Sequence, residues 1–417
     1  MQQVNLSESR NSDNSPVRAW PKDDVSRVPY WLYVDRDLYD RELQAMFYGP
    51  TWNYVGCVDE VRQPGDYKSS WIGERSVIVT RDHDGALSVL ENACSHRGTR
   101  VVWCAKGNGS RLTCPYHQWS FSLKGDLVGV PFKRGLKGEG GYPSDFDTVD
   151  HGIRKLKHVE RGGLIWATFS EDPPDLETYF AEALPGLDRV FSRPTRVLGY
   201  QRQLLSCNWK LYIENLRDPY HATLLHTFYV TFGLLRAGNK FLLGTAAGGA
   251  HSVTVTENTG KKEKDSTGEI GRFGEGLTLA DPTLVTPIPE FADGKVTGGT
   301  LHPSSVMHQQ ANSIAIRHLV PKGPGQTELI WTFFGYEGDT EEMTLRRRKQ
   351  ANLFGPAGLV SVDDTEVLKF VQATAESYQD HVGLVEFGGR DTADTSHMLS
   401  EGQIRAFYKY YRQVMQI

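Results

Sequence analysis

Two short pairs of metal-binding side chains limit what this chain can fold into more strongly than any other feature of the sequence. Cys94 and His96 form a Cys-x-His pair, and Cys114 and His117 form a Cys-x-x-His pair after seventeen intervening residues. If each pair lies on a tight loop, the two loops can approach one metal centre from opposite sides. A tetrahedral zinc ion would accept these four ligands. A [2Fe–2S] cluster of the Rieske type would also accept them, with both thiolates on one iron and both imidazoles on the other.

The order of the ligands favours the cluster over zinc. Zinc fingers usually pair cysteine with cysteine and histidine with histidine along the chain. Each pair here is mixed, so each loop can give one ligand to each iron. Cys104 lies between the pairs without a histidine at short spacing, and we do not expect it to bind the metal. A zinc-stabilised binding protein without a redox role is the alternative that the spacing leaves open.

Composition excludes several classes of protein. The 417 residues carry a net charge of −5, with 39% hydrophobic and 23% charged residues, which is typical of a soluble protein without a nucleic-acid partner. The basic run 346–349 is interpreted as a solvated helix face. No run of about 18 apolar residues predicts a membrane span, and the polar start lacks a signal-peptide core. Five unevenly spread cysteines indicate a reduced, cytoplasmic enzyme.

The pattern of apolar residues predicts an α+β fold. Residues 45–165 contain short β-type runs separated by turn residues, which indicate a small all-β unit around the Cys/His pairs. Longer helical stretches mixed with strands follow. The polar, glycine-rich segment 236–276 suggests a mobile loop over a site, and residues 400–417 predict a helix that begins with a Ser400–Gln403 capping box. The predicted buried face of this helix consists of Ile404, Phe407, Tyr408 and Tyr411.

A second set of candidate metal ligands lies in residues 208–226. His221 and His226 would point about 140° apart on a straight helix, so they converge only if the helix is distorted. Pro219 supplies a break, because Asp218 can be the N-cap of a helix that restarts at the proline. Two imidazoles and one carboxylate form the facial triad of non-haem Fe(II) oxygenases, which leaves coordination positions open for O₂ and substrate.

The carboxylate of such a triad has three candidates. Asp218 is near, but it can instead orient the His221 ring through a hydrogen bond. Asp363 and Asp364 adjoin an apolar run that can hold a short acidic turn against the core. The spacing alone does not choose among the three acids.

Together these motifs resemble the large (α) subunit of Rieske non-haem iron aromatic-ring-hydroxylating oxygenases. The resemblance covers nearly the whole chain in the family's order: C-x-H-R-G and C-P-Y-H-Q-W, then N-W-K and E-N-x-x-D-x-Y-H with the downstream histidine, then the D-D segment. It implies a small all-β Rieske domain and a larger catalytic domain of antiparallel sheet covered by helices, of the helix-grip type. The implied boundaries are 1–44 for an N-terminal segment that packs on the catalytic domain, 45–165 for the Rieske domain and 166–417 for the catalytic domain.

The resemblance also implies cofactors, residue roles and partners. Asp218 would hydrogen-bond His221 and reach His117 of the partner subunit, which carries an electron between chains. NADH would act through a separate reductase with or without a ferredoxin, since no phosphate-binding glycine motif is present. A small β subunit and a trimeric assembly, α₃ or α₃β₃, are expected. The implied ligands are Cys94, His96, Cys114 and His117 for one [2Fe–2S] cluster, and His221, His226 and Asp364 for one mononuclear Fe(II).

Within the family, the chain resembles the branch that uses O₂ to hydroxylate benzoate-like acids: salicylate 5-hydroxylase most closely, then terephthalate and anthranilate dioxygenases. Residues 27–47 and 309–322 carry this likeness. Arg317 matches the position that would bind the carboxylate through its forked guanidinium, and Asn208 is a second expected substrate contact. The absence of an equally placed second arginine favours a monocarboxylate. The alternatives are a terephthalate-type dioxygenase and a Rieske monooxygenase or demethylase of another aromatic.

Overall fold

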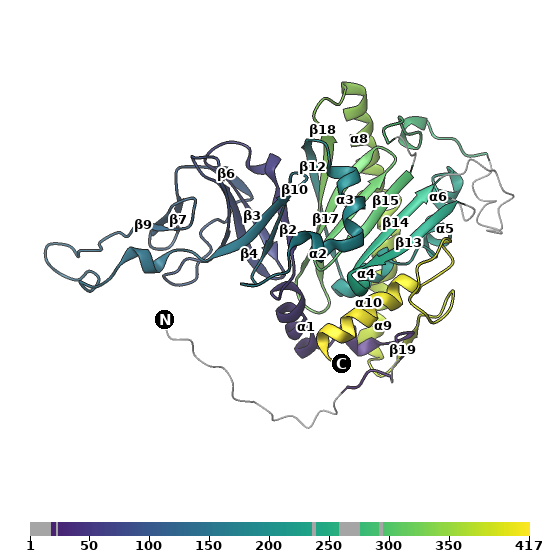
Figure 1. The fold of residues 1–417 in the computed structure, drawn as a ribbon, viewed down its shortest axis with the longest axis horizontal. Coiled ribbons are helices and arrows are strands. Elements are labelled where there is room, and N and C mark those ends of the chain that lie inside the picture. The colour runs from purple at the N-terminus through teal and green to yellow at the C-terminus, as the bar shows by residue number, and fades with distance from the viewer. Residues whose placement is uncertain (1–17, 22–23, 236–238, 258–275, 292–294) are drawn as a thin grey trace.

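Two seven-stranded sheets, in which every strand pairing is antiparallel, frame the molecule (Figure 1). The computed structural model describes residues 18–21, 24–235, 239–257, 276–291 and 295–417. Helices lie mainly around the second sheet, whereas the first sheet is accompanied by a small three-stranded sheet and loops (Figure 1). The predicted α+β class with antiparallel sheets is confirmed.

The first sheet has the strand order β2-β11-β10-β5-β4-β3-β6. Its β10–β11 hairpin turns at Gly162 and Gly163, which both have positive φ, as a two-residue hairpin turn requires. The strands are β2 (Asn53–Cys57), β3 (Asp66–Ile72), β4 (Arg75–Arg81), β5 (Leu87–Glu91), β6 (Lys106–Asn108), β10 (Lys155–Arg161) and β11 (Leu164–Thr168). The small sheet consists of β7 (Leu112–Thr113), β8 (Ser120–Phe121) and β9 (Leu127–Gly129).

The second sheet has the order β12-β18-β17-β16-β15-β14-β13. Its strands are β12 (Thr195–Leu205), β13 (Lys240–Ala246), β14 (His251–Glu257), β15 (Lys295–Leu301), β16 (Ser305–Gln310), β17 (Ser313–Pro321) and β18 (Thr327–Tyr336). The prediction of an irregular loop over residues 236–276 is therefore wrong for residues 240–257, which form the hairpin β13–β14. Gly248 and Gly249, two of the glycines that suggested a loop, lie in the tight turn at 247–249. Residues 236–238 and 258–275 of that segment lie outside the described residues.

Helices cover the second sheet and close the molecule against the N-terminal segment. Apart from short 3₁₀ and π-helical segments, the described helices are α1 (Arg36–Glu42), α2 (Leu176–Phe180), α3 (Leu184–Phe191), α4 (Trp209–Leu216), α5 (Ala222–Leu225), α6 (Thr227–Thr231), α8 (Glu341–Phe354), α9 (Ser361–Ser377) and α10 (Gly402–Met415). None of the described helices combines the length and apolar composition that crossing a bilayer requires.

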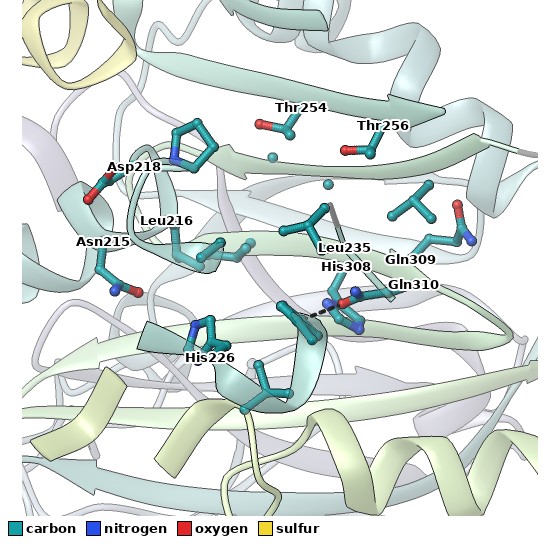
Figure 2. Close-up of a pocket in the computed structure, with 18 of the residues that line it drawn as sticks. Asn215, Leu216, Asp218, His226, Leu235, Thr254, Thr256, His308, Gln309 and Gln310 are labelled. Carbon is teal, nitrogen blue, oxygen red and sulfur yellow. Dashed lines mark hydrogen bonds between the residues drawn. The ribbon is translucent and has the colours of Figure 1, made fainter. Parts of the chain in front are cut away.

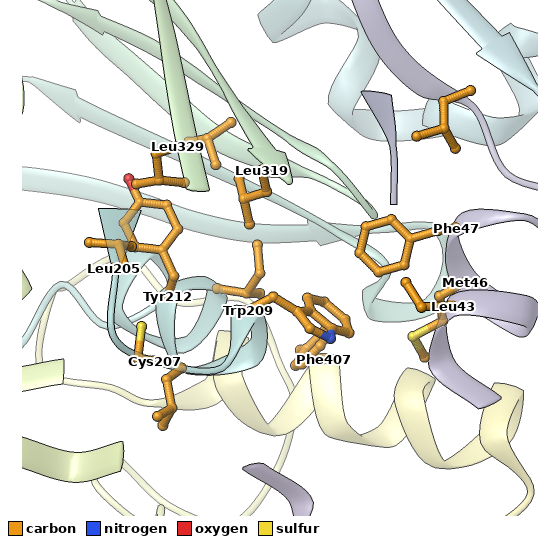
Figure 3. Packing of buried hydrophobic residues seen from close by; sticks show 14 of the residues in the cluster. Leu43, Met46, Phe47, Leu205, Cys207, Trp209, Tyr212, Leu319, Leu329 and Phe407 are labelled. Carbon is orange, nitrogen blue, oxygen red and sulfur yellow. The ribbon is translucent and has the colours of Figure 1, made fainter. Parts of the chain in front are cut away.

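The largest apolar cluster joins the N-terminal segment, the second sheet and the C-terminal helix (Figure 3). Trp209 at the start of α4 is fully buried. Its ring meets Phe47 at a centroid distance of 5.4 Å and Phe407 of α10 at 6.1 Å. Burial of such a side chain stabilises a fold by about 3–5 kcal/mol relative to alanine. This cluster holds the N-terminus of α4, and with it the helical segment that carries the candidate iron ligands.

The N-terminal segment also pairs directly with the C-terminal part of the chain. Strand β1 (Arg27–Pro29) is antiparallel to β19 (Val382–Leu384), and the Trp20 ring lies 5.3 Å from that of Tyr408. The four residues predicted to form the buried face of α10 are all buried, so that prediction is confirmed.

Two local predictions are wrong. The Ser400–Gln403 capping box does not form, because Gln403 Nε2 instead donates to the carbonyl groups of Gly244 and Val253. The basic run of α8 is not wholly solvated, because Arg347 is 1% exposed and pairs with Glu290 and Asp339. In both cases the polar side chain makes a contact with a distant part of the chain, whereas the local sequence pattern assigned it to a helix cap or to the solvated surface.

Candidate metal centres and active-site cavity

The first candidate centre is built from two loops with the same local geometry. Cys94 follows β5, and Cys114 lies between β7 and β8. In each loop the cysteine carbonyl accepts from the amide four residues later, Gly98 at 2.8 Å and Gln118 at 3.1 Å. Both of these residues have positive φ, which turns the chain back sharply. The two loops therefore present Cys and His side chains from matching tight turns, as the paired motifs predict.

The side chains of these loops suit a two-iron cluster. The rings of His96 and His117 lie 4.5 Å apart between centroids, and His96 stacks on Trp119 at 4.8 Å. The Nδ1 atom of His96 is buried without a hydrogen-bond partner, which leaves a lone pair for a metal. Both thiols are buried, and burial raises the pKa of Cys94. A thiol with a raised pKa keeps its proton when no metal is bound and loses it when a metal binds. The two loops therefore suit metal-bound thiolates better than free thiolates.

The spacing of the four side chains is too wide for one zinc ion. Bonds of about 2.0–2.3 Å would hold the four ligand atoms of tetrahedral zinc within roughly 4 Å of one another. Among the described residues, only a different group brings three possible metal ligands within 4.8 Å of one another. The Cys/His set thus fits a centre larger than a single ion, as a cluster with two irons is.

That different group is His221, His226 and Asp364. The Nε2 atoms of His221 and His226 lie 3.5 and 3.2 Å from Asp364 Oδ1. Burial alone would raise the pKa of Asp364, but the two histidines outweigh it and lower that pKa. The carboxylate is therefore held in the ionised form that binds a metal.

Two breaks in the helical segment aim both imidazoles at Asp364. Asp218 Oδ1 accepts from the amides of Tyr220 and His221 at 2.9 and 3.3 Å, a capping interaction where Pro219 predicts one. Helix α5 begins only at Ala222, three residues later than predicted. A second break lies at His226 itself, whose φ of −86° and ψ of 79° are not helical. No residue pattern around His226 predicts this second break.

Each imidazole has its own acid on the side away from Asp364. Asp218 Oδ2 lies 3.3 Å from His221 Nδ1, and Asp363 Oδ2 lies 3.5 Å from His226 Nδ1. Burial lowers the pKa of His221, but Asp218 and Asp364 overcome this and raise it to about 9. Acids in this position orient metal-binding imidazoles and select their tautomer. Of the three candidate carboxylates, Asp364 thus faces both histidines, and Asp218 and Asp363 lie behind one ring each.

Asn215 belongs to the same centre although sequence reasoning assigned it no role. Its Nδ2 atom donates to Asp364 Oδ1 at 3.1 Å and lies 3.4 Å from His221 Nε2. Asn215 lies on α4, six residues before His221, and its place in the E-N-x-x-D motif was the available signal.

A cavity extends from these ligands along the second sheet. In Figure 2, Asn215, Asp218 and His226 lie at one end, and Thr254 and Thr256 of β14 lie toward the other. Strand β16 contributes Val306, His308 and Gln310, among others, and α9 contributes Ser361 and Asp364. The candidate iron ligands and the space for a substrate are thus continuous.

Arg317 lines this cavity as predicted. Its guanidinium carbon lies 4.0 Å from the ring centre of Trp331, its Nη1 donates to the Tyr212 hydroxyl at 3.0 Å, and its Nη2 donates to His308 Nδ1 at 2.9 Å. Its Nε atom is buried without a partner. Arg317 forms no ion pair with a carboxylate in the described part of the chain, so its positive charge is left for a ligand.

Asn208, the second expected substrate contact, does not line the cavity. Its side chain is fully buried, accepts from the Lys210 amide at 3.0 Å as the N-cap of α4, and donates to the carbonyl groups of Tyr33 and Pro324. The amide oxygen of the side chain thus starts α4, and its amide nitrogen anchors that end of the helix to the neighbouring segments. The expected contact with substrate is replaced by this structural role.

Comparison with known proteins defines the class of protein that this fold and these two ligand sets build. Residues 51–139 match the Rieske [2Fe-2S] domain, and residues 187–417 match the ring hydroxylating alpha subunit (catalytic domain). The chain belongs to the family of ring-hydroxylating oxygenase alpha subunits. It is an aromatic-ring-hydroxylating oxygenase with a Rieske [2Fe–2S] cluster and a mononuclear iron as cofactors, which excludes the zinc-stabilised binding protein.

The relatives of known function are similar over almost their full length. The chain is 46% identical to the salicylate 5-hydroxylase large oxygenase component of a Ralstonia species, covering 95% of this chain and 96% of that protein. It is 42% identical to the anthranilate 1,2-dioxygenase large subunit of Burkholderia cepacia, with 95% of both chains covered. The fold is similar to that of naphthalene 1,2-dioxygenase from Rhodococcus, with a TM-score of 0.77 at 24% identity, over 93% of this chain and 94% of that one.

Proposed function

We propose that the chain is the large oxygenase component of a system that hydroxylates the ring of a benzoate-type aromatic acid with O₂. The observation that carries this proposal is Arg317, which lines the same cavity as His221, His226 and Asp364 and lacks a carboxylate partner among the described residues. A partly buried guanidinium held by neutral neighbours attracts an anionic ligand. The salicylate and anthranilate enzymes among the relatives are named for such acids.

The cavity favours one carboxylate over two. Arg317 is the sole lysine or arginine among the described residues that line it. A dicarboxylate such as terephthalate would bring its second charge to a wall without a described cation, at a cost in desolvation. This supports a monocarboxylate in preference to a terephthalate-type substrate, although a terephthalate dioxygenase component is also a relative, at 38% identity.

The proposed metal ligands are those of the two centres already described. Cys94, His96, Cys114 and His117 hold the [2Fe–2S] cluster, and His221, His226 and Asp364 hold the mononuclear Fe(II). When bound, these groups supply one-electron storage and O₂ chemistry. Asn215 and Asp363 position the ligand side chains through the contacts described above. Arg317 binds the carboxylate and so turns the ring of the substrate toward the ligand end of the cavity.

Asp218 is proposed to link two subunits. Its Oδ1 is fixed by backbone amides, whereas its Oδ2 faces His221. The side chain is 21% exposed, so it can also accept from an imidazole of a second chain. We assign that imidazole to His117 of the partner subunit, whose cluster lies on an exposed tip next to Tyr116, itself 56% exposed. A contact of this kind, repeated from each subunit to the next, closes a ring of subunits. We propose that the ring is a trimer, either α₃ or, with a small subunit, α₃β₃.

The remaining proposals concern domains, partners and location. We keep the division at 1–44, 45–165 and 166–417 as a proposal; the strands of the first sheet, from Asn53 of β2 to Thr168 of β11, agree with it except that β11 runs three residues past the boundary at 165. Electrons from NADH arrive through a separate reductase, with or without a ferredoxin, as the word "component" in a relative's name suggests. A cytoplasmic location is supported by the five cysteines, none of which forms a disulfide.

The test is O₂ uptake with product analysis, using the purified chain reconstituted with iron, a ferredoxin and a reductase. Salicylate, anthranilate and benzoate should stimulate uptake and give ring-hydroxylated products, and terephthalate should do so less. Dealkylation of an O-methyl aromatic without ring hydroxylation would instead establish the monooxygenase or demethylase alternative. Uptake without any hydroxylated aromatic acid would refute the proposal.

A further inference from the structure

His308 is a cavity residue that the proposed function does not yet use. It lies on β16, lines the cavity and is 7% exposed. Its Nε2 atom is buried without a hydrogen-bond partner. A buried polar atom without a partner destabilises a protein, so it calls for an explanation when it belongs to a residue in the wall of a ligand cavity.

The sheet register places His308 beside Arg317. Val306 of β16 is directly opposite Arg317 of β17, and Arg317 is opposite Trp331 of β18. Side chains two residues apart on a strand share a face, so His308, Arg317 and Trp331 all project to the same side of the sheet. The diagonal neighbours His308 and Arg317 are joined by the hydrogen bond from Nη2 to Nδ1 at 2.9 Å.

This hydrogen bond determines which nitrogen of His308 carries the proton. A guanidinium is only a donor, so Nδ1 of His308 must accept. Burial and the charge of Arg317 hold the pKa of His308 well below its usual value, and the ring is neutral. In a neutral imidazole whose Nδ1 accepts, the proton is on Nε2. The unpartnered Nε2 is therefore an N–H donor that is fixed in this state.

The direction of this donor separates it from the carboxylate site. Nδ1 and Nε2 point to different sides of the imidazole ring, so the Nε2–H points away from the guanidinium that occupies Nδ1. It cannot serve the same oxygen atoms as Arg317. It suits an acceptor elsewhere on the ligand, and on a benzoate-type acid such an acceptor is a substituent of the ring.

We propose that the Nε2–H of His308 donates a hydrogen bond to an oxygen substituent on the ring of the substrate, so that the cavity prefers hydroxylated benzoates. This inference rests on the proposed binding of the carboxylate by Arg317. A phenolic oxygen accepts a hydrogen bond, whereas the nitrogen of an aromatic amine is a poor acceptor and unsubstituted benzoate offers none. Either would leave the donor unpartnered, which disfavours binding by about 10- to 100-fold.

Two substitutions separate the two nitrogens of His308. In His308→Asn, the side-chain oxygen can take the place of Nδ1 as acceptor for Arg317, but no donor reaches the position of Nε2. In His308→Gln, the longer amide can place an N–H near the position of Nε2. Arg317→Lys serves as the control for the carboxylate, because it removes the forked guanidinium but keeps a charged donor that can hold Nδ1 of His308 as the acceptor.

The experiment measures dissociation constants by calorimetry under anaerobic conditions, with iron-loaded protein and five ligands: benzoate, anthranilate, and the 2-, 3- and 4-hydroxybenzoates. The wild type should bind at least one hydroxybenzoate about 10-fold or more tighter than benzoate and anthranilate. His308→Asn should abolish this preference while benzoate binding changes less than about threefold, and His308→Gln should restore part of it. Arg317→Lys should weaken all five ligands by similar factors.

The outcomes distinguish this inference from the function on which it rests. A preference for hydroxybenzoates that persists in His308→Asn would overturn the role of His308 while Arg317 and the benzoate-type substrate stand. Equal weakening of all five ligands by His308→Asn would overturn it too, because that would make His308 only a support for Arg317. A wild type that binds none of the five acids would overturn both proposals.

Discussion

Asp364 Oδ1 lies 3.2 Å from Nε2 of His226, although the two residues belong to separate helical segments that meet only in the folded protein. The same oxygen is 3.5 Å from Nε2 of His221. Because one carboxylate oxygen faces two imidazole nitrogens, the three side chains can converge on a single ion. The same three side chains line the cavity that contains Arg317, so the placement of Asp364 joins the proposed metal site to the proposed substrate site.

Replacing Arg317 should weaken the binding of aromatic acids without removing either metal. Arg317→Gln loses a charged donor to the substrate, which we expect to raise KM by about 10- to 100-fold, whereas the visible spectrum and iron content stay unchanged. Arg317→Lys is the matched control, because it keeps the positive charge but not the forked guanidinium. Its KM should lie between those of the wild type and Arg317→Gln. Steady-state O₂ uptake against substrate concentration measures this. An unchanged KM in Arg317→Gln would show that another group binds the carboxylate.

Asp218→Asn should retain both metals but lose coupled turnover, by about 10- to 100-fold, because an amide cannot replace the second carboxylate oxygen that is proposed to lie between His221 and an imidazole of the partner subunit. Asp363→Asn is the matched comparison, since it also removes a carboxylate behind an iron-site imidazole. It should lower iron affinity more than it slows electron transfer. Single-turnover oxidation of the reduced cluster, followed by its absorbance, separates the two effects. Normal cluster oxidation in Asp218→Asn would contradict the inter-subunit role.

Cys104→Ser should leave the spectrum of the cluster intact. Cys104 is half-buried, and its Sγ lies 4.0 Å from the Tyr67 hydroxyl, outside the two matching turns. Cys114→Ser removes a proposed ligand from such a turn and should bleach the visible absorption. Absorbance and iron content of the two purified variants, measured side by side, give the answer. Loss of colour in Cys104→Ser would place this thiol at the cluster.

Glu214 should make stability depend on pH. Burial raises its pKa to about 7, although hydrogen bonds from Tyr408 and Tyr33 oppose the shift. Between pH 4.5 and 7 the unfolded chain would ionise this carboxyl while the folded protein keeps it protonated, so the stability that this group contributes is lost as pH rises through that window. Glu214→Gln keeps an acceptor for both tyrosines and cannot ionise.

We therefore expect the melting temperature of Glu214→Gln, relative to the wild type, to rise from pH 5 to pH 8 by roughly 5 °C. Differential scanning at several pH values, with metals loaded in both proteins, measures this difference. Glu171→Gln is a suitable control because the Glu171 side chain is 81% exposed. A constant difference between Glu214→Gln and the wild type across pH would show that Glu214 is ionised in the folded protein.

Where the proposed ligands occur in short motifs, the sequence was sufficient to nominate them. The two Cys/His pairs lie on turns that each close within four residues, so their geometry is local and follows from a few side chains and one residue of positive φ. The same holds for Asp218, whose capping contacts reach only Tyr220 and His221. The α+β class likewise follows from strand-like and helix-like patterns along the chain.

Local spacing left three candidate acids open and only the family resemblance implied Asp364; the tertiary structure is what brings Asp364 to face the two histidines and decides which other polar residues line the cavity. Asp363 and Asp364 are neighbours in sequence, but they point to different atoms because successive residues of a helix project about 100° apart. Asn208 was expected at the substrate and is instead buried as a helix cap, and His308 escaped notice because its partner Arg317 lies on another strand. The sequence thus determined the chemistry available to this protein, and the packing of α4, α9 and the second sheet determined its arrangement, because contacts between distant segments depend on register and helix rotation, which no local pattern records.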